Sequence, residues 1–315
     1  MLELPIAFAL DLFFGDPEYS WHPVRIIGGW IQKSEAWLRA HFPDEKLGGL
    51  LQAIFIPTVV YAFVWLVTEI AFQIHPLFKS ILAIYFFYSS ISIKDLSSEA
   101  RRVHLALRNG KLESAREHLS RIVGRDTQDL NEDEVVRGAV ETVAESFVDG
   151  VLSPLFYAAL GGAPLAMAYK AVNTLDSMVG LRTPKYREYG KAAAKIDEIA
   201  NWLPARISWF LIGLATFFVN GRTQEAWHVA AQNLGSRGLS NGTIPEAAFA
   251  GALGVQLGGT NSYSGEKFQT PQLGYPMHSL DPSDIRRAVQ LMKASSWVAL
   301  GAAMVIQLWA SLLFV

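Results

Sequence analysis

The chain has 315 residues, of which 51% are hydrophobic and only 18% are charged, and its formal net charge is −2. An average soluble domain has roughly 25% charged residues. The composition therefore excludes a disordered chain and a basic nucleic-acid-binding protein, and we expect no nucleic-acid partner. The chain contains no cysteine, which excludes disulfides, thiolate nucleophiles and cysteine-ligated metals. A bound metal would use oxygen or imidazole ligands, and hard oxygen ligands favour Mg²⁺.

The first polar feature along the chain is a turn-rich stretch at residues 11–25, with the sequence DLFFGDPEYSWHPVR. Proline follows both Asp16 and His22, and a residue before proline is restricted to extended or turn conformations. Asp16, His22 and Arg25 are therefore expected in one compact segment. Because a lone histidine is usually structural, this stretch is weak evidence for a binding site.

Long uncharged runs decide the class of protein. Segments 47–68 and 294–315 each have 22 residues without a charged side chain, and about 20 apolar residues cross a bilayer. Segment 151–169 is also uncharged but contains Pro and Gly, and segments 80–93 and 207–221 are shorter, with basic residues at both ends. Basic side chains can reach the interface and lengthen such segments. We predict an all-α, polytopic integral membrane protein with four to five spans in the lipid bilayer of the cell (inner) membrane.

Three polar stretches, 94–150, 170–204 and 222–293, carry most of the candidate site residues. The first two are rich in Lys and Arg, which is typical of cytoplasmic loops, so we expect helical cytoplasmic loops and a site that faces the cytoplasm. A full crossing by 151–169 would place these two stretches on opposite sides. Irregular backbone is tolerated at membrane depth where protein or a cavity covers it. We therefore predict a re-entrant or discontinuous segment at 151–169.

Helical spacing of apolar residues in 94–150 predicts a helical hairpin followed by a third helix. Asn109 and Gly110 supply the stop between the first two helices, and Asn131 with Glu134 three residues later predicts the N-terminus of the third. The glycines of the later run 251–259 do not match the known phosphate-binding motifs. We expect Gly254 and Gly258 to serve close helix packing.

Three carboxylates, Glu141, Glu145 and Asp149, follow one another at a spacing of four residues. A continuing helix would align them on one face, where like charges repel. One interpretation is a solvated acidic face. The other is a site for Mg²⁺ and phosphate, in which the cation offsets the repulsion.

A second polar face is predicted at Lys170, Asn173 and Asp176, at the end of an apolar segment. One such residue would be an ordinary interfacial anchor, but three at this spacing favour a functional site, because ionisable residues at membrane depth usually mark one. A cationic cluster beside carboxylates follows and suits polyphosphate and a carboxylate substrate. Its members are Arg182, Lys185, Tyr186, Arg187, Asp197, Asn201 and Arg206.

These stretches, taken together and in order, resemble the CobD/CbiB family of cobalamin biosynthesis, the membrane adenosylcobinamide-phosphate synthases. The matching stretches are 11–25, 122–127 (IVGRDT), 137–157 (RGAVETVAESFVDGVLSPLFY), 169–206 and 245–259 (PEAAFAGALGVQLGG), and YKAVNTLDSMVG at 169–180 is highly specific. Ser146, Leu181 and the segment 239–241 depart from the family pattern. The resemblance covers nearly the whole chain, so we expect a single family domain over residues 1–315.

The resemblance implies an ATP-dependent ligase with Mg²⁺. Its substrates would be adenosylcobyric acid and (R)-1-amino-2-propanol or its O-phosphate, and protein partners would be a second copy of the chain or other enzymes of late cobalamin assembly. The candidate residues are Asp197, Glu198, Lys170 and Asn173 for catalysis, Arg125, Arg182, Tyr186, Arg206, Asp16, His22 and Arg25 for phosphate or corrinoid binding, and Glu141, Glu145, Asp149, Asp126 and Asp176 for the metal.

Two other classes compete with this interpretation. A non-enzymatic membrane sensor of the AmpE type would share the scaffold but need not keep Glu141, Glu145, Asp149, Lys170, Asn173 and Asp176 together. A small-solute transporter would suit broken spans with buried charges, but the two halves of the sequence show no inverted repeat. The joint presence of the acidic and basic residues favours the enzyme.

Overall fold

The computed structural model describes residues 2–313 except 17, 18, 20, 182, 235–239 and 264. Its contacts divide the chain into two compact units. Unit 1 comprises Met1–Ser92, Asp149–Leu203 and Leu300–Val315, and unit 2 comprises Ile93–Val148 and Pro204–Ala299. Both units are therefore assembled from segments that are distant in the sequence.

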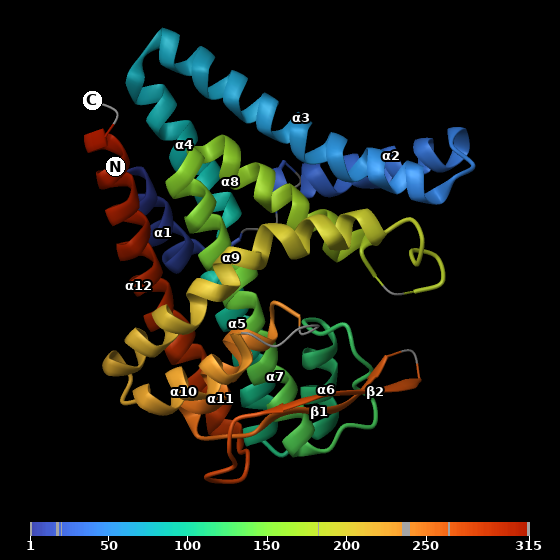
Figure 1. Ribbon diagram of the computed structural model, residues 1–315, viewed down its shortest axis with the longest axis vertical. Coiled ribbons are helices and arrows are strands. Elements are labelled where there is room, and N and C mark those ends of the chain that lie inside the picture. The colour runs from blue at the N-terminus through green and yellow to red at the C-terminus, as the bar shows by residue number, and fades with distance from the viewer. Residues whose placement is uncertain are drawn as a thin grey trace. The chain divides into compact units, whose positions relative to one another are not determined.

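Unit 1 is built from long apolar helices. They are α1 (Glu3–Phe14), α2 (Pro23–His41), α3 (Glu45–Ile74), α4 (Pro76–Ser90), α8 (Ser153–Val179), the first part of α9 (Lys191–Ala215) and the end of α12 (Pro282–Leu313). Helix α3 packs against α2, α4 and α8 (Figure 1). Its start approaches the chain at Tyr189 so closely that a Cβ atom at Gly49 would lie 1.8 Å from the Tyr189 carbonyl oxygen.

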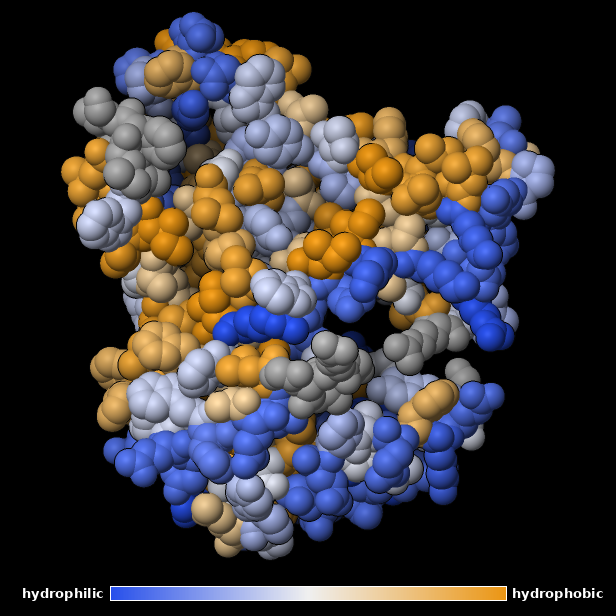
Figure 2. Space-filling model, viewed as in Figure 1, coloured by the Kyte–Doolittle hydropathy of each residue, from blue (hydrophilic) through white to orange (hydrophobic). Residues whose placement is uncertain are grey.

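The outer side of α3 exposes large apolar side chains, among them Phe55, Phe63 and Trp65, each about half or more accessible. Figure 2 shows hydrophobic side chains gathered over α3, whereas hydrophilic ones dominate the face of unit 2 around the β-hairpin. A soluble protein would not expose such a surface. The exposed face of α3 fits contact with lipid.

Four helical stretches among the described residues are long and apolar enough to cross a membrane: Glu45–Ile74, Pro76–Arg108, Glu132–Val179 and Pro282–Trp309. They contain all or most of the segments 47–68, 80–93, 151–169 and 294–315, which confirms the polytopic membrane class. Segment 207–221, in contrast, falls on the end of α9 and the 3₁₀ turn Thr216–Phe218 and is not among the four. By length and composition, the four stretches fall within the predicted range of four to five spans.

Helix α8 is broken within the predicted discontinuous segment. Gly161 (φ −142°, ψ 18°) and Gly162 (φ 68°, ψ −160°) leave the helical conformation just before Pro164. Only glycine adopts the backbone angles of Gly162 readily, and Pro164 removes a hydrogen-bond donor from the next turn. The predicted discontinuity at 151–169 is confirmed.

Unit 2 combines short helices with a hairpin. Its elements are α5 (Ile93–Arg108), α6 (Leu112–Ser120), α7 (Glu132–Phe147), α10 (Thr223–Leu234), α11 (Thr243–Leu253), β1 (Leu257–Tyr263), β2 (Glu266–Leu273) and the adjoining parts of α9 and α12. Helices α5 and α6 turn at Gly110 (φ 67°). Asn131 and Glu134 form the predicted reciprocal cap of α7, since each accepts a hydrogen bond from the backbone N–H of the other.

The antiparallel pair β1–β2 lies beside α7 and α11 (Figure 1) and is a small exception to the all-α prediction. The expectation that Gly254 and Gly258 serve helix packing is wrong. Gly254 ends α11 in the left-handed conformation (φ 72°), and Gly258 lies in β1 with φ 79°. The sequence signal was ambiguous because glycine favours a helix end or an irregular strand as readily as a close helix contact.

Candidate functional site

Glu141 lies at the centre of a buried ion-pair network in unit 2. Its carboxylate accepts a short hydrogen bond from Arg125 Nη2 and one of 2.8 Å from the backbone N–H of Gly258, and Arg137 Nε lies 3.8 Å away. The side chains of Glu141 and Arg125 are only 6% and 8% exposed. The interpretation of Glu141 as part of a solvated acidic face is therefore wrong. Arg125 provides the opposite charge that a buried carboxylate requires.

Glycine is required at position 258 for this contact. A Cβ atom there would lie 1.9 Å from the Pro271 carbonyl oxygen of β2, and the backbone has φ 79°. The strand therefore bends next to α7, where it presents a backbone donor to Glu141. Arg137 holds the same strand by donating to the carbonyl oxygens of Gly258 (2.7 Å) and Thr260 (2.9 Å).

Asp126 fastens the loop before α7 to the hairpin. Its backbone N–H donates to the Ser262 carbonyl oxygen (2.8 Å), and its Oδ2 accepts from Ser262 Oγ (2.7 Å) and from the Gly265 N–H (2.8 Å). Arg125 Nη1 donates to Asn261 Oδ1 on the same strand. These contacts show that Asp126 anchors the hairpin. Its metal role stays a prediction.

Glu145 and Glu246 bring two further carboxyl groups to this part of unit 2. Glu145, one turn after Glu141, is exposed and lies against Gly242, where a Cβ atom would be 3.0 Å from Glu145 Oε1. Glu246 follows in the first turn of α11. Burial, then the charges of Glu145 and Glu141, raise the pKa of Glu246 well above its ordinary value, while Arg125 acts in the opposite direction. We call Glu141, Glu145 and Glu246 the carboxylate cluster.

Glu246 is the member that sequence reasoning missed. It is the only charged residue between Arg237 and Glu266, in a stretch whose most obvious features are its glycines and its family resemblance. An isolated acid in an apolar run is itself a signal, because glutamate is seldom buried without a partner. Arg206 lies nearby, since its Nη1 donates to Asn241 Oδ1 (3.3 Å), next to Gly242. Unit 2 thus brings Arg125 and Arg206 together with the carboxylate cluster.

Asp149 does not continue the predicted stripe. Helix α7 ends at Phe147, and the π-helical turn Val148–Leu152 follows. A π turn carries five residues between hydrogen-bonded groups, so the four-residue spacing no longer aligns the side chains on one face. Asp149 opens a segment of unit 1, whereas Glu141 and Glu145 belong to unit 2.

Unit 1 contains a second polar site around Asn201. The hydroxyls of Ser153 (2.6 Å) and Tyr169 (2.9 Å) donate to Asn201 Oδ1, and Asn201 Nδ2 donates to Asp197 Oδ2 (3.0 Å). Asn201 is 2% exposed. Asp197 is therefore held in a fixed orientation by buried neutral groups. Glu198, which points elsewhere, is exposed and pairs with Lys195 (2.8 Å).

Lys170, Asn173 and Asp176 form a half-buried face of α8, as the spacing predicts. Lys170 Nζ lies 3.5 Å from Ser92 Oγ, and the backbone N–H of Ser92 donates to the Gly150 carbonyl oxygen (3.0 Å). Lys170 thus lies near the π-helical turn that contains Asp149.

The remaining predicted residues of unit 1 occupy two further places. Asp16 Oδ1 lies 2.7 Å from the buried Nε2 of His22, and Arg25 is exposed. Tyr186 accepts a hydrogen bond from Lys185 Nζ (2.7 Å) and lies 3.4 Å from Glu35, so it ties its loop to α2. Arg182 lies outside the described residues.

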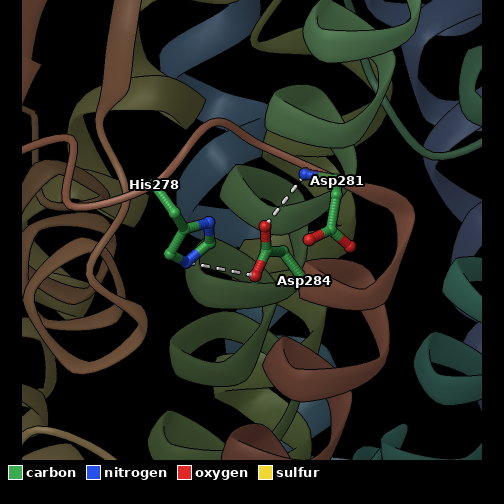
Figure 3. Close-up of side chains that lie close together, drawn as sticks. All are labelled: His278, Asp281 and Asp284. Atoms are coloured by element: carbon green, nitrogen blue, oxygen red, sulfur yellow. Dashed lines mark hydrogen bonds and ion pairs between the residues drawn. The ribbon is translucent and has the colours of Figure 1, made fainter.

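A group of metal-ligand type was not predicted at the start of α12. One ligand atom each of His278, Asp281 and Asp284 lies within 4.8 Å of the others (Figure 3). Asp281 Oδ1 accepts from the Ser283 N–H (2.6 Å), Asp284 Oδ2 accepts from the Asp281 N–H (3.0 Å), and Arg287 pairs with Asp284 (3.1 Å). Hydrogen bonds from Ser283 lower the pKa of Asp281. This reciprocal cap accounts for the proximity of the two aspartates.

The four apolar helical stretches and the charged cluster of unit 2 define a polytopic α-helical membrane protein with a site of mixed acidic and basic side chains. A family model described as CobD/Cbib protein matches residues 4–292, which extend through both units. The chain is 42% identical over 298 residues to the cobalamin biosynthesis protein CobD of Citrobacter koseri, covering 94% of this chain and 93% of that protein.

Two further relatives agree. The CobD protein of Geobacter metallireducens is 44% identical over 286 residues (91% of this chain and 90% of that protein), and the CbiB protein of Salmonella typhimurium is 40% identical over 298 residues (94% and 93%). No solved structure matches the chain. The chain belongs to the CobD/CbiB family of cobalamin biosynthesis proteins.

Proposed function

We propose that this protein is an ATP-dependent amide ligase that joins adenosylcobyric acid to (R)-1-amino-2-propanol or its O-phosphate. Family membership supports the choice of substrates. The observation that carries the proposed chemistry is the carboxylate cluster beside Arg125 and Arg206 in unit 2. This arrangement offers a place for a cation and, next to it, basic groups for phosphates.

The reaction requires such groups for a chemical reason. A carboxylate does not react with an amine at neutral pH, so ATP must first convert it into an acyl phosphate or an acyl adenylate. Either route develops charge on a polyphosphate, and fixed cationic groups stabilise that charge. Arg125, held by Glu141, is already oriented and needs no rearrangement when the charge develops. Positioning the amine at the activated carbon supplies the rest of the acceleration.

The donor set of the cluster fits Mg²⁺, which prefers carboxylate oxygen and keeps several waters. Glu145 and Glu246 are the best placed members, because both oxygens of Glu141 already face Arg125 and Gly258. Burial is the first cause of the raised pKa of Glu246, and the charges of Glu145 and Glu141 add to it. Mg²⁺ bound there would supply charge neutralisation for the phosphates of ATP.

The decisive experiment is an assay of the purified full-length protein with ATP, Mg²⁺, adenosylcobyric acid and each amine. We expect a corrinoid product heavier by the amine minus one water, formed only when ATP is present, as measured by mass spectrometry. Turnover without ATP would contradict the ligase proposal. Full turnover in excess EDTA would contradict the role of the metal.

The proposed orientation places this site on the cytoplasmic side of the inner membrane, because the polar stretches 94–150 and 170–204 are rich in basic residues. Cysteine labelling tests it cleanly, since the chain has no cysteine of its own. We expect a membrane-impermeant thiol reagent to label Ser114→Cys and Lys185→Cys in inverted vesicles and not in intact cells. Labelling from opposite sides would show that 151–169 crosses fully.

A further inference from the structure

Unit 2 contains a small polar cavity that is lined by none of the predicted site residues. Its volume is about 270 Å³, and it lies between the start of α7 and the hairpin. Asp133, Glu134 and Arg137 line it on the helix side, and Gln256, Gln269 and Gln272 line it on the other side. Pockets for drug-sized ligands run from roughly 300 to 1,000 Å³. This cavity is therefore suited to a ligand of a few heavy atoms and is far too small for a corrin ring.

Two of the three charged groups of the cavity, Glu134 and Arg137, are fixed before any ligand binds. Glu134 is held by the cap of α7, in which its Oε2 accepts from the Asn131 N–H (2.8 Å). Arg137 is held by the carbonyl oxygens of Gly258 and Thr260. Two carboxylates and one guanidinium in so small a volume complement a ligand that carries a cationic and an anionic end. The glutamine amides offer donors and acceptors to a hydroxyl or a phosphate.

Two residues link the cavity to the carboxylate cluster. Arg137 and Gly258 line the cavity. Both also approach Glu141: Arg137 Nε lies 3.8 Å from its carboxylate, and the backbone N–H of Gly258 donates to it at 2.8 Å. A ligand in the cavity is thus separated from Glu141 by one layer of side chain and backbone. A small second substrate bound here would lie beside the groups proposed to handle ATP.

We propose that this cavity binds the amine substrate, with the ammonium group at Asp133 and Glu134 and the phosphate end toward Arg137. The assignment rests on the proposed function and specifies one of its substrates, the phosphorylated amino alcohol rather than the free one. It assigns the amine to unit 2, whereas the predicted catalytic residue Asp197 belongs to unit 1.

The test combines kinetics with direct binding. The double variant Asp133→Asn/Glu134→Gln removes both negative charges, and glutamine at position 134 preserves the cap. We expect the KM for aminopropanol O-phosphate to rise at least about tenfold, because charge-assisted hydrogen bonds are lost. The KM values for ATP and adenosylcobyric acid should change by less than about twofold, because screened charges outside their sites contribute little.

The matched control is Glu132→Gln, which removes a charge from the same helical turn but from an exposed side chain that does not line the cavity. It should leave the amine KM within about twofold of the wild type. An amine KM of the double variant equal to that of Glu132→Gln would overturn the assignment. A rise of the amine KM in Asp197→Asn instead would place the amine in unit 1.

Equilibrium dialysis with labelled aminopropanol O-phosphate, without ATP or corrinoid, separates this proposal from the proposed function. Binding to the wild type and to Glu132→Gln, weakened at least about tenfold in the double variant, supports the cavity even if the protein makes no amide. Equal binding of the phosphorylated and free amines would overturn the role of Arg137. Undiminished binding in the double variant would overturn the proposal while leaving the ligase activity intact.

Discussion

Two buried polar groups, Asn201 in unit 1 and Glu141 in unit 2, are satisfied in opposite ways. Around Asn201 in unit 1, hydroxyl and amide groups satisfy one another, and a single carboxylate, Asp197, receives the last hydrogen bond. Around Glu141 in unit 2, a buried carboxylate is matched by a buried guanidinium. Neutral partners are suited to surroundings as apolar as the long helices of unit 1, because an unmatched charge is costly there. The charges of Glu141 and Arg125 are tolerated in unit 2 because each has its partner, as are those of Glu35 and Arg39 in unit 1.

The largest expected effect comes from breaking the ion pair of unit 2. Glu141→Ala leaves Arg125 buried without its carboxylate, and removal of one partner of a buried pair costs about 3–5 kcal/mol. We expect a marked loss of thermal stability of the purified protein in detergent. A double variant, Arg125→Met/Glu141→Leu, should recover most of this loss because no charge remains buried. A Glu141→Ala protein as stable as the wild type would contradict the structural role of the pair.

Replacement of Glu145 is expected to reduce activity strongly and to leave stability nearly unchanged. Glu145→Gln keeps the shape of the side chain but removes the charge proposed to bind Mg²⁺, so turnover should fall by about 10²–10³-fold. The unfolding temperature should hardly change, because deleting one of several like charges relieves repulsion. Glu113→Gln, at an exposed acid of α6, is the control. Wild-type turnover by well-folded Glu145→Gln protein would end the metal assignment at this residue.

An intermediate effect is expected in unit 1. Asn201→Ala deprives Ser153, Tyr169 and Asp197 of their shared partner, and a buried polar group without a partner costs about 1–3 kcal/mol. Tyr157→Phe, which removes only the hydrogen bond to the Ala200 carbonyl oxygen, should cost less. The unfolding temperatures of the two variants, measured in detergent, show which substitution is the more destabilising. If Tyr157→Phe proves the more damaging, the network around Asn201 does not organise this region.

The smallest effect concerns the pH dependence of stability and arises from Glu246. Its pKa is raised in the folded protein, so the proton it holds stabilises the fold below its unfolded pKa, and this contribution is lost as pH rises through the folded pKa. Glu246→Gln should flatten the decline of stability that the wild type shows as pH rises above the ordinary pKa of a glutamate, measured in the presence of EDTA. An unchanged pH profile would show that Glu246 does not sense the cluster. Added Mg²⁺ should stabilise the wild type more than the variant at high pH.

Sequence reasoning predicted what depends on short-range pattern. The apolar helices, the stop at Gly110 and the cap at Asn131 are local, and the structure has each of them. The partners of Glu141 are not local, because Gly258 comes from a strand 117 residues away. No spacing rule foretells that contact, so the sequence predicts a metal role for Glu141 and does not reveal its ion pair with Arg125. The role of Glu246 escaped for the same reason, and the π-helical turn that contains Asp149 was not predicted either.

The break in α8 sets a limit on length. Uncharged residues 150–160 precede it, which at 1.5 Å per residue span about 16 Å, and residues 163–169 follow it up to Lys170, which span about 10 Å. The hydrocarbon core of a bilayer is about 30 Å thick. Neither half of the helix reaches from one face of the membrane to the other by itself. Gly161 is moreover exposed. Its backbone N–H and C=O groups therefore need hydrogen bonds from water or from a neighbouring segment, at any depth in the membrane.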